Sequence, residues 1–294
     1  MKLFYCIVII CWAGSSMAQT IPLKTNPDGN TLLWEISGKG LTAPSYIFGT
    51  FHLLCKEDIH FSNSLKQAVS NSHEIYLELD MDDPATLMSG LMLMNMKGGK
   101  KLKDLYKPEA YKRLSDYFKD SLQTPIAMLQ GMKPEFLIAL LYPKMMPCSA
   151  TGSVEEEVMQ LAKKEDKEIK GLETMAFQAS LFDSIPYEKQ AEELLNTLDS
   201  MEKSKKYFGQ MLRAYKDQRL DEIEKIAIDP EFGFEENQDM LLDNRNKNWV
   251  KQLKEIMKKG PVFTAVGAGH LVGKAGLIAL LRKEGYTVRG LENK

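Results

Sequence analysis

Residues 45–52 read Ser-Tyr-Ile-Phe-Gly-Thr-Phe-His, and residues 262–270 read Val-Phe-Thr-Ala-Val-Gly-Ala-Gly-His. Each stretch is a run of apolar, β-prone residues that ends in a Gly-x-x-His turn and leads toward a helix. Such runs are typical of buried strands. Open α/β sheets bind ligands at the carboxyl edge of their parallel strands, so both turns are expected at that edge. The two stretches therefore favour an α/β fold with His52 and His270 at its binding edge.

The segments around these two stretches predict alternating strands and helices. On the N-terminal side, residues 32–36 and 45–48 predict a hairpin, and a helix over 62–70 leads to a strand over 74–79 in a parallel, right-handed crossover. On the C-terminal side, the expected order is a helix through 244–249, a strand at 262–266, a helix at 275–283 and a strand at 286–291. We predict a central, mainly parallel sheet built from N- and C-terminal βα units.

The middle of the chain predicts a helical insertion over about residues 84–240, within a single domain spanning 19–294. A Met- and Leu-rich helix from Pro84 to Met96 is expected to be core or a substrate-facing wall, because Met at helical spacing is usually core. Residues 167–172 predict a strand within this insertion. Residues 187–228 predict paired amphipathic helices that lie over the core.

The first eighteen residues have the organisation of a secretory signal. Lys2 precedes an apolar run from Leu3 to Trp12, and small residues lead to Ala18, after which we expect cleavage. The apolar run is shorter than the roughly 20 residues that span a bilayer, so no integral membrane segment is expected once the signal is removed. The sequence therefore predicts a periplasmic or secreted protein.

The net charge bears on which partners the protein binds, and the cysteine content bears on the compartment in which it folds. The net charge of −2 provides no general attraction for nucleic acid, so none is expected as a partner. Cys55 and Cys148 are the two cysteines left after signal removal, and in an oxidising compartment they predict one disulfide. The alternative is two separate buried thiols.

The candidate site combines His52, His270 and Glu78, the last near the end of the predicted 74–79 strand. Two imidazoles and one carboxylate suit a divalent metal such as zinc, manganese or cobalt, and they leave a coordination position for water. They can equally act without metal as an acid and a base. Three glycines would let the backbone turn sharply or approach a bound ligand or cofactor closely. They are Gly49, Gly267 and Gly269.

Other charged residues are weaker candidates. Glu173 is either a further site residue or a helix-start acid, and Arg245 either binds a substrate carboxylate or closes a salt bridge. His60 and His73 lie in polar contexts and are expected at the surface. Neither the H-E-x-x-H metalloprotease motif nor the G-x-S-x-G nucleophile elbow is present.

The order and spacing of these motifs resemble the TraB/GumN family, which includes the Tiki proteases. The resemblance rests on five segments that cover nearly the whole mature chain: Gly49–His52, Tyr76–Glu78, Gly171–Thr174 with Gln178, Arg245–Asn246 ahead of Trp249, and Gly267–Gly273. It implies an α/β fold of the Tiki, ChaN and erythromycin-esterase group and a metal-dependent peptidase activity. It also implies catalytic or metal-binding roles for His52, Glu78 and His270, with Glu173 and Arg245 as less secure additions. Glu155 stands where many relatives carry Asp, which puts a role for that carboxylate in doubt.

The preferred prediction is an exported metal-dependent hydrolase that acts on a peptide or small-molecule substrate. The first alternative is a non-catalytic protein on the same fold that sequesters haem, another small ligand or a signalling peptide. The second is a metal-free, esterase-like hydrolase. Metal content separates these readings, because only the first requires a stoichiometric divalent ion.

Overall fold

The computed structural model describes residues 23–27, 29–229 and 237–294. The predicted signal segment, its cleavage after Ala18 and the new terminus at Gln19 lie outside these ranges. A six-stranded sheet forms the centre. In spatial order its strands are β6 (Glu168–Glu173), β4 (Glu74–Leu79), β7 (Val262–Gly267), β2 (Ser45–Thr50), β1 (Leu33–Ser37) and β8 (Thr287–Gly290). The first four run parallel, whereas β1 and β8 are antiparallel to their neighbours. The predicted mainly parallel α/β sheet is confirmed.

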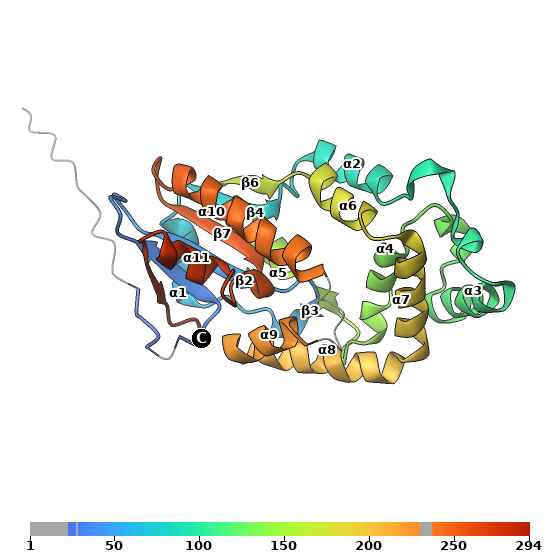
Figure 1. Cartoon of the computed structure of the whole chain (residues 1–294). Helices are drawn as coiled ribbons and strands as arrows, with labels where there is room; N and C mark the ends of the chain where they lie inside the picture. Colours follow the sequence, from blue (N-terminus) through green and yellow to red (C-terminus); the bar gives the residue numbers. More distant parts are fainter. Residues whose placement is uncertain (1–22, 28, 230–236) are drawn as a thin grey trace, which may run out of the picture.

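Helices cover the sheet and extend well beyond one end of it (Figure 1). In that view α10 and α11 lie in front of the sheet and α1 and α5 behind it, while α2, α3, α4, α6 and α7 gather on the right. The helices are α1 (Asn63–Ser70), α2 (Pro84–Leu93), α3 (Pro108–Leu122), α4 (Pro134–Ala139), α5 (Val154–Lys164), α6 (Met175–Asp183), α7 (Tyr187–Asp199), α8 (Met201–Lys216), α9 (Leu220–Ala227), α10 (Asn244–Ile256) and α11 (Leu277–Lys283). A small second sheet pairs β3 (Leu54–Cys55) with β5 (Thr151–Gly152).

The local sequence explains the central strands and the starts of two helices near the site. β2 is buried throughout, and β7 is buried except at Gly267, as expected of parallel strands covered on both faces. Ser153 and Thr174 begin α5 and α6, because each side chain accepts a hydrogen bond from a backbone N–H of the first helical turn. The predicted hairpin and the strands over 74–79, 167–172 and 262–266 are confirmed within one or two residues.

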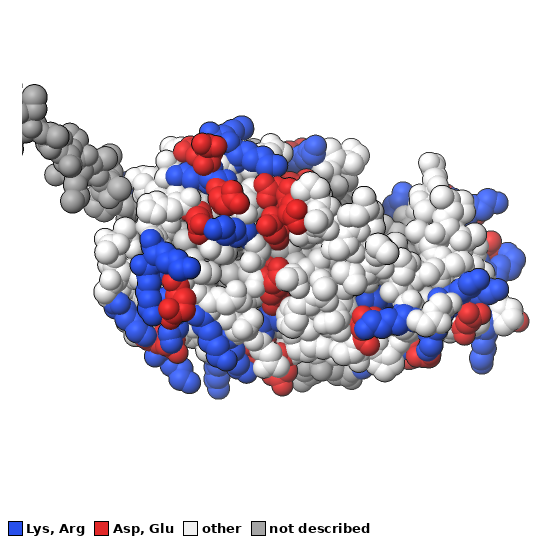
Figure 2. Space-filling view, turned by 90° about the horizontal axis from the view of Figure 1, so that it is seen from above, with Lys and Arg blue, Asp and Glu red and all other residues white. Residues whose placement is uncertain are grey.

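The expectation that the Met-rich segment forms core is wrong over α2, and the alternative of a substrate-facing wall stays a prediction. Gly90 is the one residue of this helix that is buried, whereas Met88, Leu91 and Met92 have exposed fractions of 65%, 66% and 75%. The helix is apolar on all sides and packs against α6, so only one side of it can be covered. Figure 2, seen from above, shows a largely uncharged surface in the middle of this face, with charged side chains gathered toward both ends. Among the described residues, no helix is long and apolar enough to cross a membrane.

One strand of the main sheet lies inside the range expected to form the helical insertion. β6 pairs with β4 as an edge strand, so the helices between β4 and β7 are divided into α2 to α5 before β6 and α6 to α10 after it. The division of the chain into a signal and one domain stays a prediction.

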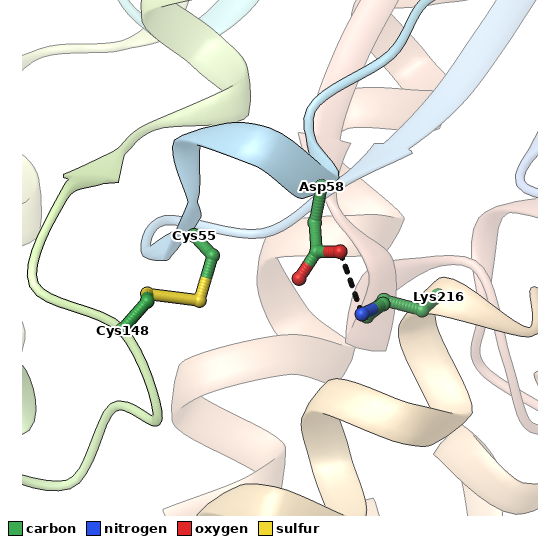
Figure 3. Close-up of a disulfide and its surroundings, with 4 residues drawn as sticks. All are labelled: Cys55, Asp58, Cys148 and Lys216. Atoms are coloured by element: carbon green, nitrogen blue, oxygen red, sulfur yellow. Dashed lines mark ion pairs between the residues drawn. A yellow bond between two sulfur atoms is a disulfide. The ribbon is translucent and has the colours of Figure 1, made fainter.

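The predicted Cys55–Cys148 disulfide is present, and it links residues 93 positions apart (Figure 3). It joins the end of β3, three residues after His52, to the segment before β5. Beside it, Asp58 Oδ1 forms an ion pair with Nζ of Lys216 in α8 at 2.6 Å. In the chain-entropy model, closing a loop of this length stabilises the fold by about 4–5 kcal/mol. The loop after His52 is thus fixed to the segment before β5 and to α8, both distant in the sequence.

Candidate active site at the carboxyl edge of the sheet

Four parallel strands end at the same level and bring the predicted residues to one edge. Thr50 of β2 is level with Gly267 of β7, and Leu79 of β4 is level with Glu173 of β6. Glu78 is the penultimate residue of β4, and His270 lies in a short 3-10 turn, η9 (Ala268–His270), directly after β7. The strand ends therefore lie at one edge, as expected. The interactions between the site residues depend on the contacts of their side chains.

Arg245 forms the centre of a buried charged cluster with two carboxylates. Its Nη2 donates to Glu78 Oε2 at 2.6 Å and to Glu173 Oε2 at 2.8 Å, and its Nε donates to Glu173 Oε2 at 3.0 Å. Gln178 Nε2 donates to the same two carboxylates at 3.2 Å. The exposed fractions of the Arg245, Glu78 and Glu173 side chains are 9%, 16% and 2%. The structure thus shows Arg245 in salt bridges with Glu78 and Glu173, which is one of the two interpretations of Arg245.

The helix that carries Arg245 begins in an irregular way. A π-helical segment, η8 (Asp239–Asp243), runs directly into α10, and Arg245 Nη1 donates to the carbonyl of Leu241 within it at 2.9 Å. Such segments are rare and frequently occur at functional sites. Trp249 lies one turn further along α10, and the guanidinium of Arg245 packs over its ring at 4.7 Å. The helix thus places Arg245 next to the strand ends, and the ring of Trp249 packs against its guanidinium.

His270 is a buried, neutral imidazole in a defined tautomer. Asn246 Nδ2 donates to the carbonyl of Ala275, so its Oδ1 accepts the proton of His270 Nδ1 at 2.7 Å. His270 Nε2 is then the unprotonated nitrogen, and it accepts from Arg245 Nη1 at 3.2 Å. Burial lowers the pKa of His270 to about 3, although the charge of Glu78 opposes this shift. Its 3.7 Å approach to Glu78 is therefore a contact of a neutral ring with a carboxylate at pH 7.

Glu78 is ionised at neutral pH. Burial alone would raise the pKa of this carboxyl group, but His270 and Arg245 more than offset burial and hold the pKa of Glu78 at about 2. Since His270 is itself neutral at pH 7, the positive charges that persist near Glu78 at that pH are the guanidinium of Arg245 and the protonated ring of His52. The N–H of Gly267 also stabilises the ionised form, because it donates to Glu78 Oε1 at 2.8 Å.

His52 lies apart from this cluster and pairs with a different carboxylate. Its Nδ1 is 2.7 Å from Oε1 of Glu155, which is in the first turn of α5 and also accepts from Ser153 Oγ at 2.6 Å. The hydrogen bond to Glu155 raises the pKa of His52 to about 9. Water reaches 77% of the His52 side chain and screens the pair, yet a shift in this direction leaves the ring protonated at neutral pH.

A cavity of about 320 Å³ lies over the strand ends, and His52, Glu78, Arg245 and His270 all line it. The opposite wall is apolar and comes from α8, α9 and residues around them. Its members include Tyr142, Phe208, Met211, Tyr215, Ile223, Ile226 and Leu242. The cavity therefore combines a polar, charged end with an apolar side, which is the usual character of a small-molecule or substrate site.

The three predicted glycines contribute in different ways. A Cβ on Gly49 would lie 2.9 Å from Leu271 Cδ1 and 3.1 Å from Ala268 Cα, so this glycine lets the two turns pack together. Gly267 and Gly269 line the cavity. A Cβ on Gly267 would stand 3.4 Å from Glu78 Oε1. His60 and His73 are exposed, as expected.

Two side chains at the strand ends meet the protonation requirements of a divalent ion, but the positions of the donors do not. An ionised Glu78 and a neutral His270 are in the protonation states that metal binding demands. Their placement does not fit, because Arg245 contacts both His270 Nε2 and Glu78 Oε2, and His52 pairs with Glu155 instead. Over residues 23–27, 29–229 and 237–294, no three His, Cys, Asp or Glu side chains converge as a metal site.

Two contributors were not assigned a role by sequence reasoning. Asn246 fixes the tautomer of His270, and the only signal for it was its place beside Arg245. Glu155, whose role was in doubt, contacts His52, and its position in the first turn of a helix after a Ser cap was a usable signal.

The fold and the cavity together define an α/β protein with a polar site at the carboxyl edge of a mainly parallel sheet. The chain belongs to the TraB/PrgY/gumN family, whose model matches residues 32–290. It is 23% identical over 321 residues to Metalloprotease TIKI1 of Danio rerio, covering 89% of this chain and 63% of that protein. Thus the chain spans less than two thirds of the length of this relative.

Two shorter similarities concern related proteins. Metalloprotease TIKI2 of Danio rerio is 31% identical over 96 residues, which cover 31% of this chain and 18% of that protein. Metalloprotease TIKI2 of Xenopus tropicalis is 28% identical over 121 residues, which cover 39% and 23%. No solved structure was found to match the chain.

Proposed function

We propose that this chain is an exported hydrolase that cleaves a peptide or peptide-like substrate in the cavity at the carboxyl edge of the sheet. One observation carries the proposal: an apolar wall faces an ionised Glu78, a neutral His270 and a protonated His52 within one cavity. The relatives named as metalloproteases support the same class of reaction. The disulfide supports an oxidising compartment.

In this proposal His52 stabilises the developing charge of the substrate. Its Nδ1 is held by Glu155, which leaves the protonated Nε2 to donate to a substrate carbonyl oxygen. Water then adds to the carbonyl carbon and its proton passes to Glu78. Glu78 returns this proton to the amide nitrogen as the C–N bond breaks, so the amine leaves neutral and the carboxylate is regenerated. In the resting arrangement Glu78 is a weak base, because Arg245 holds it. A substrate that displaces Arg245 from Glu78 would make the carboxylate more basic.

A second form of the proposal replaces these acid–base roles by a divalent ion, zinc, manganese or cobalt, that His52, Glu78 and His270 would hold once His52 has lost its proton. The names of the relatives and the ionisation of Glu78 and His270 support it. The arrangement of the donors argues for a rearrangement first, because Arg245 has to leave His270 and His52 has to leave Glu155. Metal content is accordingly measured separately from activity.

The specific observation that favours a binding protein instead is the extent of the apolar wall, which suits retention of an apolar ligand. Cleavage is the property that separates the two functions. A binding protein would hold a peptide in the cavity and release it unchanged.

The test uses the mature protein and the variants His52→Ala, Glu78→Gln and His270→Ala, with His60→Ala as the matched control at an exposed position. Cleavage of a peptide library is followed by mass spectrometry, bound metal by elemental analysis and folding by circular dichroism. We expect each site variant to lose at least about 100-fold in rate, while His60→Ala keeps the wild-type rate.

Three outcomes would change the proposal. Folded site variants that cleave as fast as wild type would place the reaction elsewhere. Wild-type protein that binds peptides without cleaving them would be a binding protein. Cleavage by metal-free wild type in the presence of a chelator would leave the hydrolase and replace the metal by acid–base chemistry.

A further inference from the structure

The cavity has a charged side at the strand ends and an apolar side formed by α8 and α9. In the part of the chain that the structure describes, the charged side chains that line it are His52 and Glu78 at the strand ends and Arg245, which reaches them from α10. Among residues 29–229 and 237–294, the facing wall from α8 and α9 presents aromatic, Met and Ile side chains and no Lys, Arg, Asp or Glu. A substrate side chain that binds against this wall is removed from water and has no charged partner among the residues that form the wall.

We infer that the site selects a peptide whose residue next to the cleaved bond is bulky, uncharged and apolar, such as Phe, Leu or Met. This inference rests on the proposed function. The apolar side chain would lie against Met211 of α8 and Ile226 of α9, while the adjoining carbonyl faces His52. A charged side chain is excluded, because burial without a partner penalises it strongly. Acidic and basic residues at that position are therefore both poor substrates.

The wall is positioned by contacts to the turn that carries His52. Tyr215 of α8 donates its hydroxyl proton to the carbonyl of Gly49 at 3.0 Å. The ring of Phe51 packs against Tyr215 at 5.2 Å and against Phe208 at 6.0 Å. The Lys216–Asp58 pair makes a further link between α8 and the disulfide-bonded loop (Figure 3). Because one set of contacts fixes both the apolar wall and the turn, the apolar subsite has a defined distance from the reacting bond.

The experiment measures cleavage of acetyl-Ala-Ala-Xaa-Ala-Ala-amide peptides by the mature protein, with Phe, Leu, Ala, Glu or Lys at the central position. Small differences in apolar size change kcat/KM by roughly 10-fold or more in such pockets. We expect Phe and Leu to exceed Ala at least about 10-fold, and Glu and Lys to be the slowest. Equal rates for all five peptides would overturn the inference.

Ile226→Lys tests the wall directly, because it adds a cation to the apolar side of the cavity. It should lower kcat/KM for the Phe peptide and raise it for the Glu peptide, which reverses the preference. Ile228→Lys is the matched control: Ile228 lies just beyond α9, is 51% exposed and does not line the cavity. If Ile226→Lys does not fold, Met211→Lys makes the same change from α8. Identical profiles for the wall and control variants would refute the apolar subsite.

Binding to Glu78→Gln separates this inference from the proposed function. Calorimetry with the Phe and Glu peptides reports selection without cleavage. If wild type cleaves no peptide but Glu78→Gln binds the Phe peptide in preference, the subsite stands and the hydrolase fails. If wild type cleaves peptides but neither cleavage nor binding prefers Phe, the hydrolase stands and the subsite fails. Absence of both cleavage and binding would overturn both.

Discussion

At the scale of single residues, Arg245 sets the charge balance of the site. It contacts Glu78, Glu173 and the unprotonated nitrogen of His270, and each of these side chains is mostly inaccessible to water. A buried carboxylate without its counterion is strongly unfavourable. Arg245 is therefore structural in the resting state, whatever it does during a reaction.

Replacement of Arg245 should destabilise the fold. We expect Arg245→Leu to lower the free energy of unfolding by about 3–5 kcal/mol, because two buried carboxylates lose their counterion. Urea denaturation followed by circular dichroism measures the change. Arg213→Leu is the control, since Arg213 is exposed on α8 and should change stability by less than about 0.5 kcal/mol. Equal effects of the two substitutions would contradict the buried cluster.

The two site histidines should titrate at opposite ends of the pH scale. His52 has a raised pKa of about 9, so it stays protonated through neutral pH and loses its proton as the pH rises through that value. His270 has a lowered pKa of about 3, so it stays neutral until the solution is strongly acidic. NMR of the ring protons in chelator-treated protein measures both. Glu155→Gln should return His52 toward the ordinary value of roughly 6.5, and an unchanged His52 curve in that variant would rule out their pairing.

At the scale of elements, periodicity and composition predicted most strands and helices, because these depend on local sequence. The environment of α2 could not be predicted in the same way. Its uniformly apolar sequence resembles that of a buried helix, but its packing depends on α6, which lies far along the chain. Similarly, residues 167–172 predicted a strand, while its partner β4 follows only from tertiary pairing.

The candidate site, too, could be predicted only in part. Strand ends place Glu78 and His270 at one edge of the sheet, because the carboxyl ends of parallel strands share an edge, whereas the expected convergence of His52 with them is not seen. The ion pairs of the site residues could not be predicted, since they depend on which charged side chains the helices outside the sheet place next to the strand ends. Glu155 from α5 pairs with His52, and Arg245 from α10 takes the position between Glu78 and His270.

Two glycines on different elements should respond oppositely to the same substitution. Gly49→Ala should destabilise by about 1–3 kcal/mol, because the added carbon meets the backbone of Ala268 and the side chain of Leu271. Gly209→Ala in α8 should stabilise by roughly 0.5–1 kcal/mol, because Ala is the better helix former and its nearest neighbour is Arg213 at an ordinary 3.6 Å. Thermal denaturation of both variants checks the signs, and a stabilising Gly49→Ala would disprove the close approach of the turns.

At the scale of the whole molecule, export is the property with the most direct test. We predict that the mature protein begins at Gln19, because Ser16 and Ala18 place small side chains where signal peptidase requires them. N-terminal sequencing of the exported protein is the measurement. A soluble product that keeps residues 1–18 would contradict the predicted localisation.

The position of β7 has a consequence for how the molecule assembles. β2 and β4 are formed from the first third of the chain, yet they do not pair with each other, because β7 lies between them. The centre of the sheet is therefore incomplete until residues 262–267 are available, and its assembly depends on contacts of very long sequence separation, which slow folding. Ribosome-bound fragments should consequently lack the finished sheet. A chain that we propose is exported would remain unfolded during synthesis without help from its leader, and could thread through a translocation channel before β7 completes the centre of the sheet.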